Sequence, residues 1–132
     1  MCLIGIHLGD GPRLLISANR DEFAARPTAP LHWWQEGLLA GKDLQAGGTW
    51  LGITRSGRFA AVTNVRDPAL RVATVPFGSR GLMVKGFLLS DCNPEAYAEQ
   101  MLTAVPGASP YNLILGQIHA DSIQVLWLGG RS

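Results

Sequence analysis

The chain has 132 residues and a formal net charge of +1, with 47% hydrophobic and only 16% charged residues. This composition predicts one folded domain, 1–132, with a buried core, and it excludes general disorder. Lys and Arg are scattered and no apolar run is long enough to cross a bilayer, so we expect no nucleic-acid partner, no membrane span and a cytoplasmic location.

Two short apolar runs at 2–8 and 14–19 flank a Gly-Asp-Gly-Pro turn. They predict an antiparallel hairpin, and their near-continuous hydrophobicity favours strands that lie between two layers. Residues 23–48 contain Pro27, Pro30 and several glycines, so we expect a long connection that is either functional or hides a short strand around 31–34.

A second hairpin is predicted at 50–55 and 58–65, across Ser56-Gly57, and a loop follows at 66–78. Ser79 is a suitable N-cap for a helix to about residue 90. Pro94 at a first helical position predicts a second helix to about residue 104. The runs 112–118 and 122–128 then predict a third hairpin.

This element order predicts an α+β fold of antiparallel hairpins, with both helices in one layer on one face of a sheet. The other face needs a cover, which a second sheet, missing chain or a homo-oligomer could supply. Because the sequence stops just after a predicted strand, we expect a domain that is truncated at its C-terminus.

Cys2 is the first candidate for chemistry. Removal of Met1 would leave its thiol beside a free α-amine, whose reference pKa of about 7.7–8.0 suits a general base. The alternative is a small apolar residue in a core strand, which is the commoner role of a free cysteine. Cys92, at the junction of the two helices, is expected to be structural.

The tetrad Asn19-Arg20-Asp21-Glu22 ends the second predicted strand. In an antiparallel hairpin, residues 18–21 should lie opposite Cys2. Arg20 could then hold a thiolate or a substrate carboxylate, and Asp21 could anchor the α-ammonium. A solvated strand end with a surface ion pair is the alternative.

Further polar and aromatic residues are candidates for the same site. The side-chain amides of Asn64 and Asn112 could donate to an oxyanion, although such residues more often cap strand ends. Two further groups are expected beside the site, Trp33 and Trp34 as pocket walls or core, and Gly48, Thr49 and Trp50 as a close backbone approach. His7, His32 and His119 have no metal-ligand spacing, so no metal or cofactor is predicted.

Several segments of the chain resemble the NRDE family, also called the transport and Golgi organisation family. The matching segments are Met1-Cys2, Asn19-Arg20-Asp21-Glu22, Ala40-Gly41-Lys42-Asp43, Gly47-Gly48-Thr49-Trp50-Leu51-Gly52, Thr63-Asn64-Val65-Arg66, Ser79-Arg80-Gly81 and Tyr111-Asn112-Leu113. That family is similar to N-terminal-nucleophile (Ntn) hydrolases, so the resemblance implies the N-terminal part of an αββα sandwich.

The resemblance implies roles for the candidate residues. Cys2 would be nucleophile and base, Arg20 and Asp21 its supports, and Asn64 and Asn112 the oxyanion donors. Asn19 and Glu22 would contact substrate. The first functional hypothesis is therefore a cysteine hydrolase of a linear amide.

The second hypothesis is a non-catalytic carrier or trafficking protein for a lipid, acyl-coenzyme A or haem, because animal members of the family are linked to those ligands. Trp33, Trp34 and the Gly47-Gly48 stretch would then face the ligand, and His32 would be a weak candidate for a haem ligand. A third alternative is an inactive fragment that needs a partner.

Overall fold

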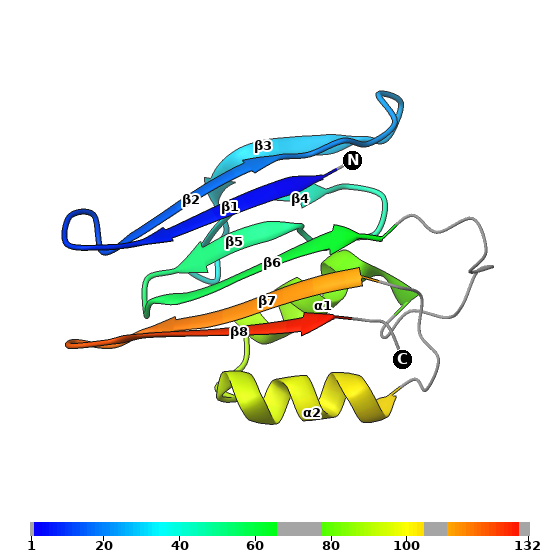
Figure 1. The fold of residues 1–132 in the computed structure, drawn as a ribbon. Helices are drawn as coiled ribbons and strands as arrows, with labels where there is room; N and C mark the ends of the chain where they lie inside the picture. Colours follow the sequence, from blue (N-terminus) through cyan, green and yellow to red (C-terminus); the bar gives the residue numbers. More distant parts are fainter. Residues whose placement is uncertain (1, 66–77, 105–110, 130–132) are drawn as a thin grey trace.

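The computed structural model describes residues 2–65, 78–104 and 111–129, which form three layers. A two-stranded hairpin, β1 (Leu3–Leu8) and β2 (Leu14–Asn19), lies on one face of a six-stranded sheet, and two helices lie on the other face (Figure 1). The sheet contains β3 (Thr28–Trp33), β4 (Leu38–Asp43), β5 (Leu51–Thr54), β6 (Arg58–Asn64), β7 (Tyr111–Ile118) and β8 (Ile123–Gly129). The helices are α1 (Arg80–Leu88) and α2 (Pro94–Ala104).

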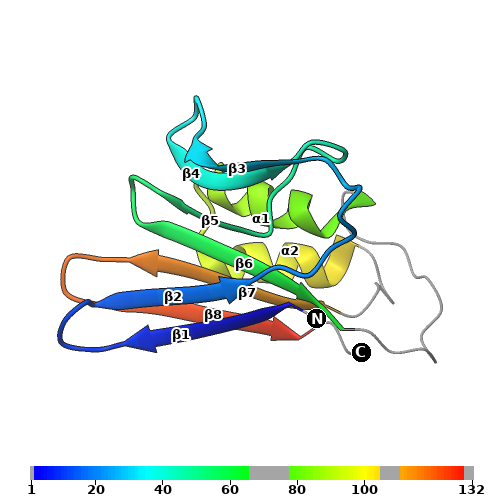
Figure 2. The same ribbon diagram turned by 90° about the horizontal axis from the view of Figure 1, so that it is seen from above.

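The six strands lie side by side in sequence order, and each neighbouring pair is antiparallel. Viewed from above, the hairpin crosses over β6, β7 and β8 (Figure 2). The prediction of an α+β fold, with antiparallel hairpins and one helical layer, is confirmed. The cover on the second sheet face is the β1–β2 hairpin.

The prediction of a long connection at 23–48 was wrong, because this segment forms the paired strands β3 and β4. Trp34 donates its backbone N–H to the carbonyl of Leu38 at 2.7 Å, and Gly37 supplies the positive φ of 80° that the turn between the strands requires. Pro30 made β3 hard to recognise from the sequence, because proline is uncommon inside strands. The pairing register between β3 and β4 shifts at this proline, between Ala29 and His32.

The main core lies between the sheet and the helices. Alternate residues of the sheet, such as Val62, Leu113 and Leu115, pack with Met83 and Phe87 of α1, and all five are buried. Residues that pair across β6 and β7 share a face, so Phe59 and Ala61 lie on the opposite side, beneath the hairpin layer. They are also buried, which gives the molecule a second, smaller core.

The hairpin itself is covered on one side only. Leu3 is 67% exposed and Leu15 is 50% exposed, and both lie on the face that points away from the sheet. The prediction that both faces of these strands are covered by packed layers was therefore wrong for the residues described. At the far turn, Arg13 donates to the carbonyls of His119 at 2.8 Å and Ser122 at 3.2 Å, which ties the hairpin to the β7–β8 turn.

Both helices begin where the sequence predicts, although α1 ends at Leu88, earlier than expected. Its C-terminal end is held by Arg58, which donates to the carbonyl of Phe87 at 3.0 Å and to that of Cys92 at 2.6 Å. At the start of α2, the side-chain oxygen of Asn93 accepts the backbone N–H of Ala96 at 2.8 Å. These contacts fix the helical layer against the sheet.

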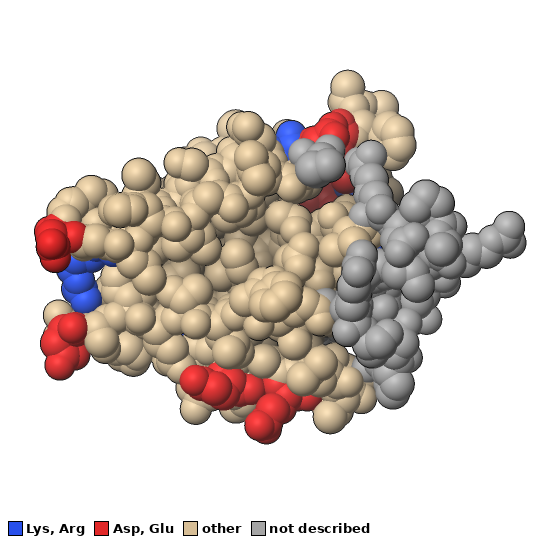
Figure 3. Space-filling model, in the orientation of Figure 1, with Lys and Arg blue, Asp and Glu red and all other residues tan. Residues whose placement is uncertain are grey.

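The face that presents the edge strands β1 and β8 is uncharged at its centre, and acidic side chains gather along its lower border over α2 (Figure 3). Its exposed apolar residues include Trp127, which is 66% exposed. Across the described part of the chain, none of the helices has the length and apolar character needed to cross a membrane.

Candidate functional site

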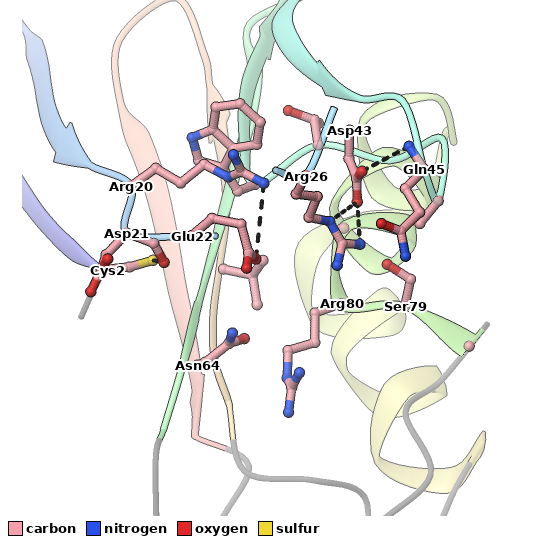
Figure 4. A pocket seen from close by; sticks show the side chains of 16 residues that line it. Cys2, Arg20, Asp21, Glu22, Arg26, Asp43, Gln45, Asn64, Ser79 and Arg80 are labelled. Carbon is pink, nitrogen blue, oxygen red and sulfur yellow. Dashed lines mark hydrogen bonds and ion pairs between the residues drawn. The ribbon is translucent and has the colours of Figure 1, made fainter. Parts of the chain in front are cut away.

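A polar cavity of about 430 Å³ opens at the end of the layers where the N-terminus lies. Residues from the hairpin, the β4–β5 loop, the end of β6 and the start of α1 enclose it (Figure 4). Its lining consists of Cys2, Arg20, Asp21, Glu22, Arg26, Asp43, Gln45, Ala46, Thr49, Trp50, Val62, Asn64, Gly78, Ser79, Arg80 and Gly81.

Cys2 and three residues of the tetrad, Arg20, Asp21 and Glu22, meet at one edge of this cavity. Leu3 pairs with Asn19, so Cys2 lies opposite Arg20, in the register that the hairpin pattern predicts. The Cys2 Sγ lies 3.9 Å from the backbone carbonyl of Asp21, to which the thiol donates. Cys2 is half-buried and lines the cavity. Its thiol is therefore next to open space as well as to the Asp21 carbonyl.

Arg20 is fixed by three neighbours. Its guanidinium stacks 4.2 Å from the ring centre of Trp50 and donates to the Thr28 hydroxyl at 3.2 Å. A loose ion pair of 4.0 Å joins it to Glu22. These contacts hold the Arg20 guanidinium in the wall of the cavity, beside the Glu22 carboxylate.

A stronger ion pair crosses the opposite wall. Arg26 donates to the Asp43 carboxylate at 2.6 Å, and the backbone N–H of Gln45 donates to the same carboxylate at 3.0 Å. The hydrogen bond from Arg26 is the main reason that the pKa of Asp43 lies below its usual range. The charges of Arg26 and Asp43 neutralise each other. The contact between Asp43 and Gln45 stabilises the start of the loop that carries Thr49 and Trp50.

Asn64 and Arg80 lie across the opening from Arg26 (Figure 4). The Asn64 side chain is exposed at the end of β6. Arg80 is the first residue of α1, and its Nε is buried with no hydrogen-bond partner among the described residues. Desolvation by burial lowers the pKa of this guanidinium. Arg80 as a whole is only half-buried, so the rest of its guanidinium is available to the polar cavity that it lines.

Glycines bring α1 close to the cavity. A Cβ on Gly48 would lie 2.4 Å from the carbonyl carbon of Gly81, and the backbone N–H of Thr49 donates to the Gly81 carbonyl at 3.2 Å. The β4–β5 loop therefore touches the first turn of α1, backbone against backbone. This is the close approach predicted from the sequence, and it sets the position of the neighbouring Arg80.

Some predicted site residues lie elsewhere. Asn112 donates to Thr63 and accepts from the Trp127 indole, and it is not part of either cavity lining described here. Asn19 is exposed at the end of β2 and lies outside those linings. Trp33 is 48% exposed and stacks with Arg55 at 4.0 Å, whereas Trp34 is buried in the main core.

The sequence reasoning missed Arg26 and Arg80 as site residues. Arg26 lies in a segment that was expected to be an unstructured connection, and no local pattern marks it. Arg80 falls in the Ser79-Arg80-Gly81 segment, whose only signal was its family resemblance. Both reach the cavity through tertiary packing.

A second, apolar cavity of about 480 Å³ lies between β2 and the strands β3, β4 and β5. Its lining is mostly aliphatic, and it includes Leu14, Ile16, Leu31, Leu39, Leu51 and Ile53. Arg20 and Trp50 line this cavity as well as the polar one. The two cavities therefore share a wall, which is made of the stacked Arg20–Trp50 pair.

Metal-ligating side chains do not gather in groups of three or more within the described ranges. His32 is exposed on β3, where its Nδ1 lies 2.6 Å from the Pro30 carbonyl, and it is outside both cavity linings. The chemistry that the polar cavity offers is that of a thiol surrounded by arginine, carboxylate and amide groups.

A family model described as Transport and Golgi organisation 2 matches residues 1–132. Similar curated proteins are the transport and Golgi organization protein 2 homologs of Bos taurus and Homo sapiens and the corresponding homolog of Mus musculus, each 33% identical over 142 residues. Each match covers 99% of this chain and 50% of the relative. The chain thus spans about half the length of the curated relatives it matches.

Proposed function

The chain belongs to the Transport and Golgi organisation 2 family, and we propose that it is a cysteine hydrolase that cleaves a linear amide bond. The observation that carries this proposal is the meeting of Cys2, Arg20, Asp21 and Asn64 around one open cavity. The layered hairpin, sheet and helices are compatible with part of an Ntn-hydrolase sandwich, and the proposal includes that relationship.

The reaction begins after Met1 is removed, when Cys2 carries a free α-amine. The amine takes the thiol proton, and the sulfur attacks the amide carbonyl carbon, forming a C–S bond. The carbonyl electrons move to the oxygen, where the Asn64 amide donates a hydrogen bond. The C–N bond then breaks, and the leaving nitrogen takes the proton that the α-amine had accepted.

Water completes the cycle. It attacks the thioester carbonyl and gives one proton to the α-amine, and the C–S bond breaks to release the carboxylic acid. The sulfur recovers its proton, so the net reaction is amide plus water to acid plus amine. Arg20 favours the thiolate through its charge, and the Asp21 carboxylate orients the α-ammonium.

Intact mass spectrometry is the first test, because a retained Met1 would rule out an N-terminal nucleophile. Thiol labelling near neutral pH then measures the reactivity of Cys2, with Cys2→Ala used to subtract the signal of Cys92. We expect rapid labelling that Arg20→Met slows. Arg55→Met is the matched control, since Arg55 also stacks on a tryptophan but lies outside both cavities.

Hydrolysis is measured on N-acyl p-nitroanilides, which are linear amides with a coloured product. Wild-type turnover that disappears in Cys2→Ala and persists in Cys92→Ala supports the proposal. Labelling of Cys2 no faster than that of a free thiol, together with no turnover, would contradict it.

The apolar cavity favours a second candidate function, a non-catalytic carrier of a lipid, acyl-coenzyme A or haem. A carrier would bind its ligand equally well in the wild type and in Cys2→Ala, and it would release the ligand unchanged. Recovery of intact ligand after long incubation with the wild-type chain distinguishes this function from hydrolysis.

A further inference from the structure

The shared wall between the two cavities restricts what one ligand can look like. Arg20 and Trp50 are in van der Waals stacking distance, and each faces both the apolar and the polar cavity. A molecule that passes this wall has an apolar part on one side and a polar part on the other. Its middle lies beside Arg20, opposite which Cys2 is placed in the hairpin.

The apolar side suits a flexible aliphatic chain. At about 480 Å³ the cavity falls within the usual range of small-molecule sites, roughly 300–1,000 Å³. Its lining comes from facing layers, with Leu14 and Ile16 from the hairpin and Leu39 and Ile53 from the sheet. Apolar surface on both sides of a gap favours a chain that removes both from water.

The polar side contains a cation that its surroundings do not fully satisfy. Arg26 is paired with Asp43 and Arg20 with Glu22, whereas Arg80 lines the cavity without an ion pair to another described residue. A guanidinium that is short of acceptors is matched by a carboxylate, which accepts two parallel hydrogen bonds from it.

We propose that the ligand is an N-acyl amino acid, with an aliphatic acyl chain in the apolar cavity and a carboxylate on the amine part at Arg80. The amide then lies at the Arg20–Trp50 wall, within the part of the polar cavity that Cys2 lines. This inference rests on the proposed function, which identifies the bond that is cut as an amide. It adds the chemical identity of the groups on both sides of that amide.

Binding of defined probes tests the inference without turnover. Isothermal titration calorimetry is done on the Cys2→Ala chain with N-decanoylglycine, with decanamide, which lacks the carboxylate, and with N-acetylglycine, which lacks the chain. We expect N-decanoylglycine to bind at least about tenfold more tightly than either truncated probe, because each end contributes separately.

Two further substitutions in the Cys2→Ala background assign the ends. Arg80→Met should weaken N-decanoylglycine to the affinity of decanamide and leave decanamide unchanged, while Arg80→Lys should retain part of the difference. Leu31→Asp, at an exposed residue on the rim of the apolar cavity, should weaken both decanoyl probes and leave N-acetylglycine unchanged. Arg55→Met and Leu102→Asp are the controls outside both cavities, and circular dichroism verifies the fold of each variant.

Absence of binding, or an equal effect of Arg80→Met on decanamide and N-decanoylglycine, would overturn the inference. The outcome is separable from that of the proposed function. The expected binding pattern without turnover in the wild type would refute hydrolysis and leave the ligand class standing. Turnover of short N-acyl anilides without binding of N-decanoylglycine would refute the ligand class alone.

Discussion

Gly48 and Gly81 lie backbone against backbone, so close that a Cβ on Gly48 would be 2.4 Å from the Gly81 carbonyl carbon. This contact joins the β4–β5 loop to the first turn of α1. One side of it carries Trp50 and the other carries Arg80, so it sets the distance between two walls of the polar cavity.

Gly48→Ala should therefore push the loop and helix apart. Because the obstacle is backbone rather than a flexible side chain, we expect the free energy of unfolding to fall by about 1–3 kcal/mol. Urea denaturation measures this loss. Gly5→Ala is the matched control, since the nearest atom to its added Cβ is 4.0 Å away, and an equal effect of both variants would contradict the packing argument.

The Arg26–Asp43 ion pair predicts a pH dependence of stability. Since the folded-state pKa of Asp43 is lowered, its contribution is present above the unfolded value of about 3.9 and is lost as the pH falls through the folded value. Asp43→Asn should lower the free energy of unfolding at pH 7 by about 1–3 kcal/mol, with a smaller difference from wild type at pH 3.

The measurement is urea denaturation at both pH values, with Asp10→Asn on the exposed β1–β2 turn as the control. A difference between Asp43→Asn and wild type that stays constant from pH 7 to pH 3 would show that the ion pair is not its source.

Arg58 is predicted to be a major contributor to stability. It is 8% exposed, and its guanidinium donates to the Phe87 and Cys92 carbonyls. Arg58→Met would remove the hydrogen bond to the Cys92 carbonyl and leave the Phe87 carbonyl with Ser90 alone as donor among the described residues, which should cost about 2–4 kcal/mol in a denaturant titration. Arg55→Met, at a stacked surface arginine, should cost less than about 0.5 kcal/mol. Similar losses in the two variants would refute the capping role.

Alkaline pH should destabilise the fold through its tyrosines. Burial is the main cause that raises the pKa of Tyr97 to about 12, so its contribution is complete below the unfolded value of about 10 and is lost as the pH rises through the folded one. Tyr97→Phe should therefore show a smaller drop in unfolding free energy between pH 9 and pH 11 than the wild type.

Tyr97→Phe also removes the hydrogen bond from its hydroxyl to the Met83 carbonyl, which should cost about 1 kcal/mol at pH 8. Tyr111 is the other tyrosine of the chain, and burial raises its pKa as well. The double variant Tyr97→Phe, Tyr111→Phe should have the flattest alkaline profile. Profiles of equal slope in all variants would count against the tyrosines.

The sequence predicted the elements whose signals are local. Tight turns between apolar runs mark three hairpins, and Ser79 and Pro94 mark the starts of the two helices. The β3–β4 hairpin was missed because proline and glycine are common in loops, and Pro30 and several glycines lie in this segment. In addition, β4 differs from a loop mainly in its burial against the helices, which the local sequence does not reveal. Burial of this kind depends on the whole fold.

The same distinction applies to the site. Hairpin register alone brings Cys2 beside Arg20, because the two strands that they adjoin, β1 and β2, are joined by one short turn. Arg26, Asp43 and Arg80 come from separate segments, and only the packing of loop, sheet and helix brings them together. Asn112 and Asn64 look equivalent as strand-end amides, yet the neighbours of Asn112 turn its amide toward Thr63.

The one-sided hairpin has a consequence for amide hydrogen exchange. Strands β1 and β2 are mostly exposed and form a sheet of their own, whereas β6 is buried along most of its length and pairs with strands on both sides. Local opening of the hairpin therefore costs less free energy than opening of β6, and its amides should exchange first. Cys2 thus adjoins the hairpin, whose amides should exchange early. Asn64 lies at the end of β6, whose amides should exchange late.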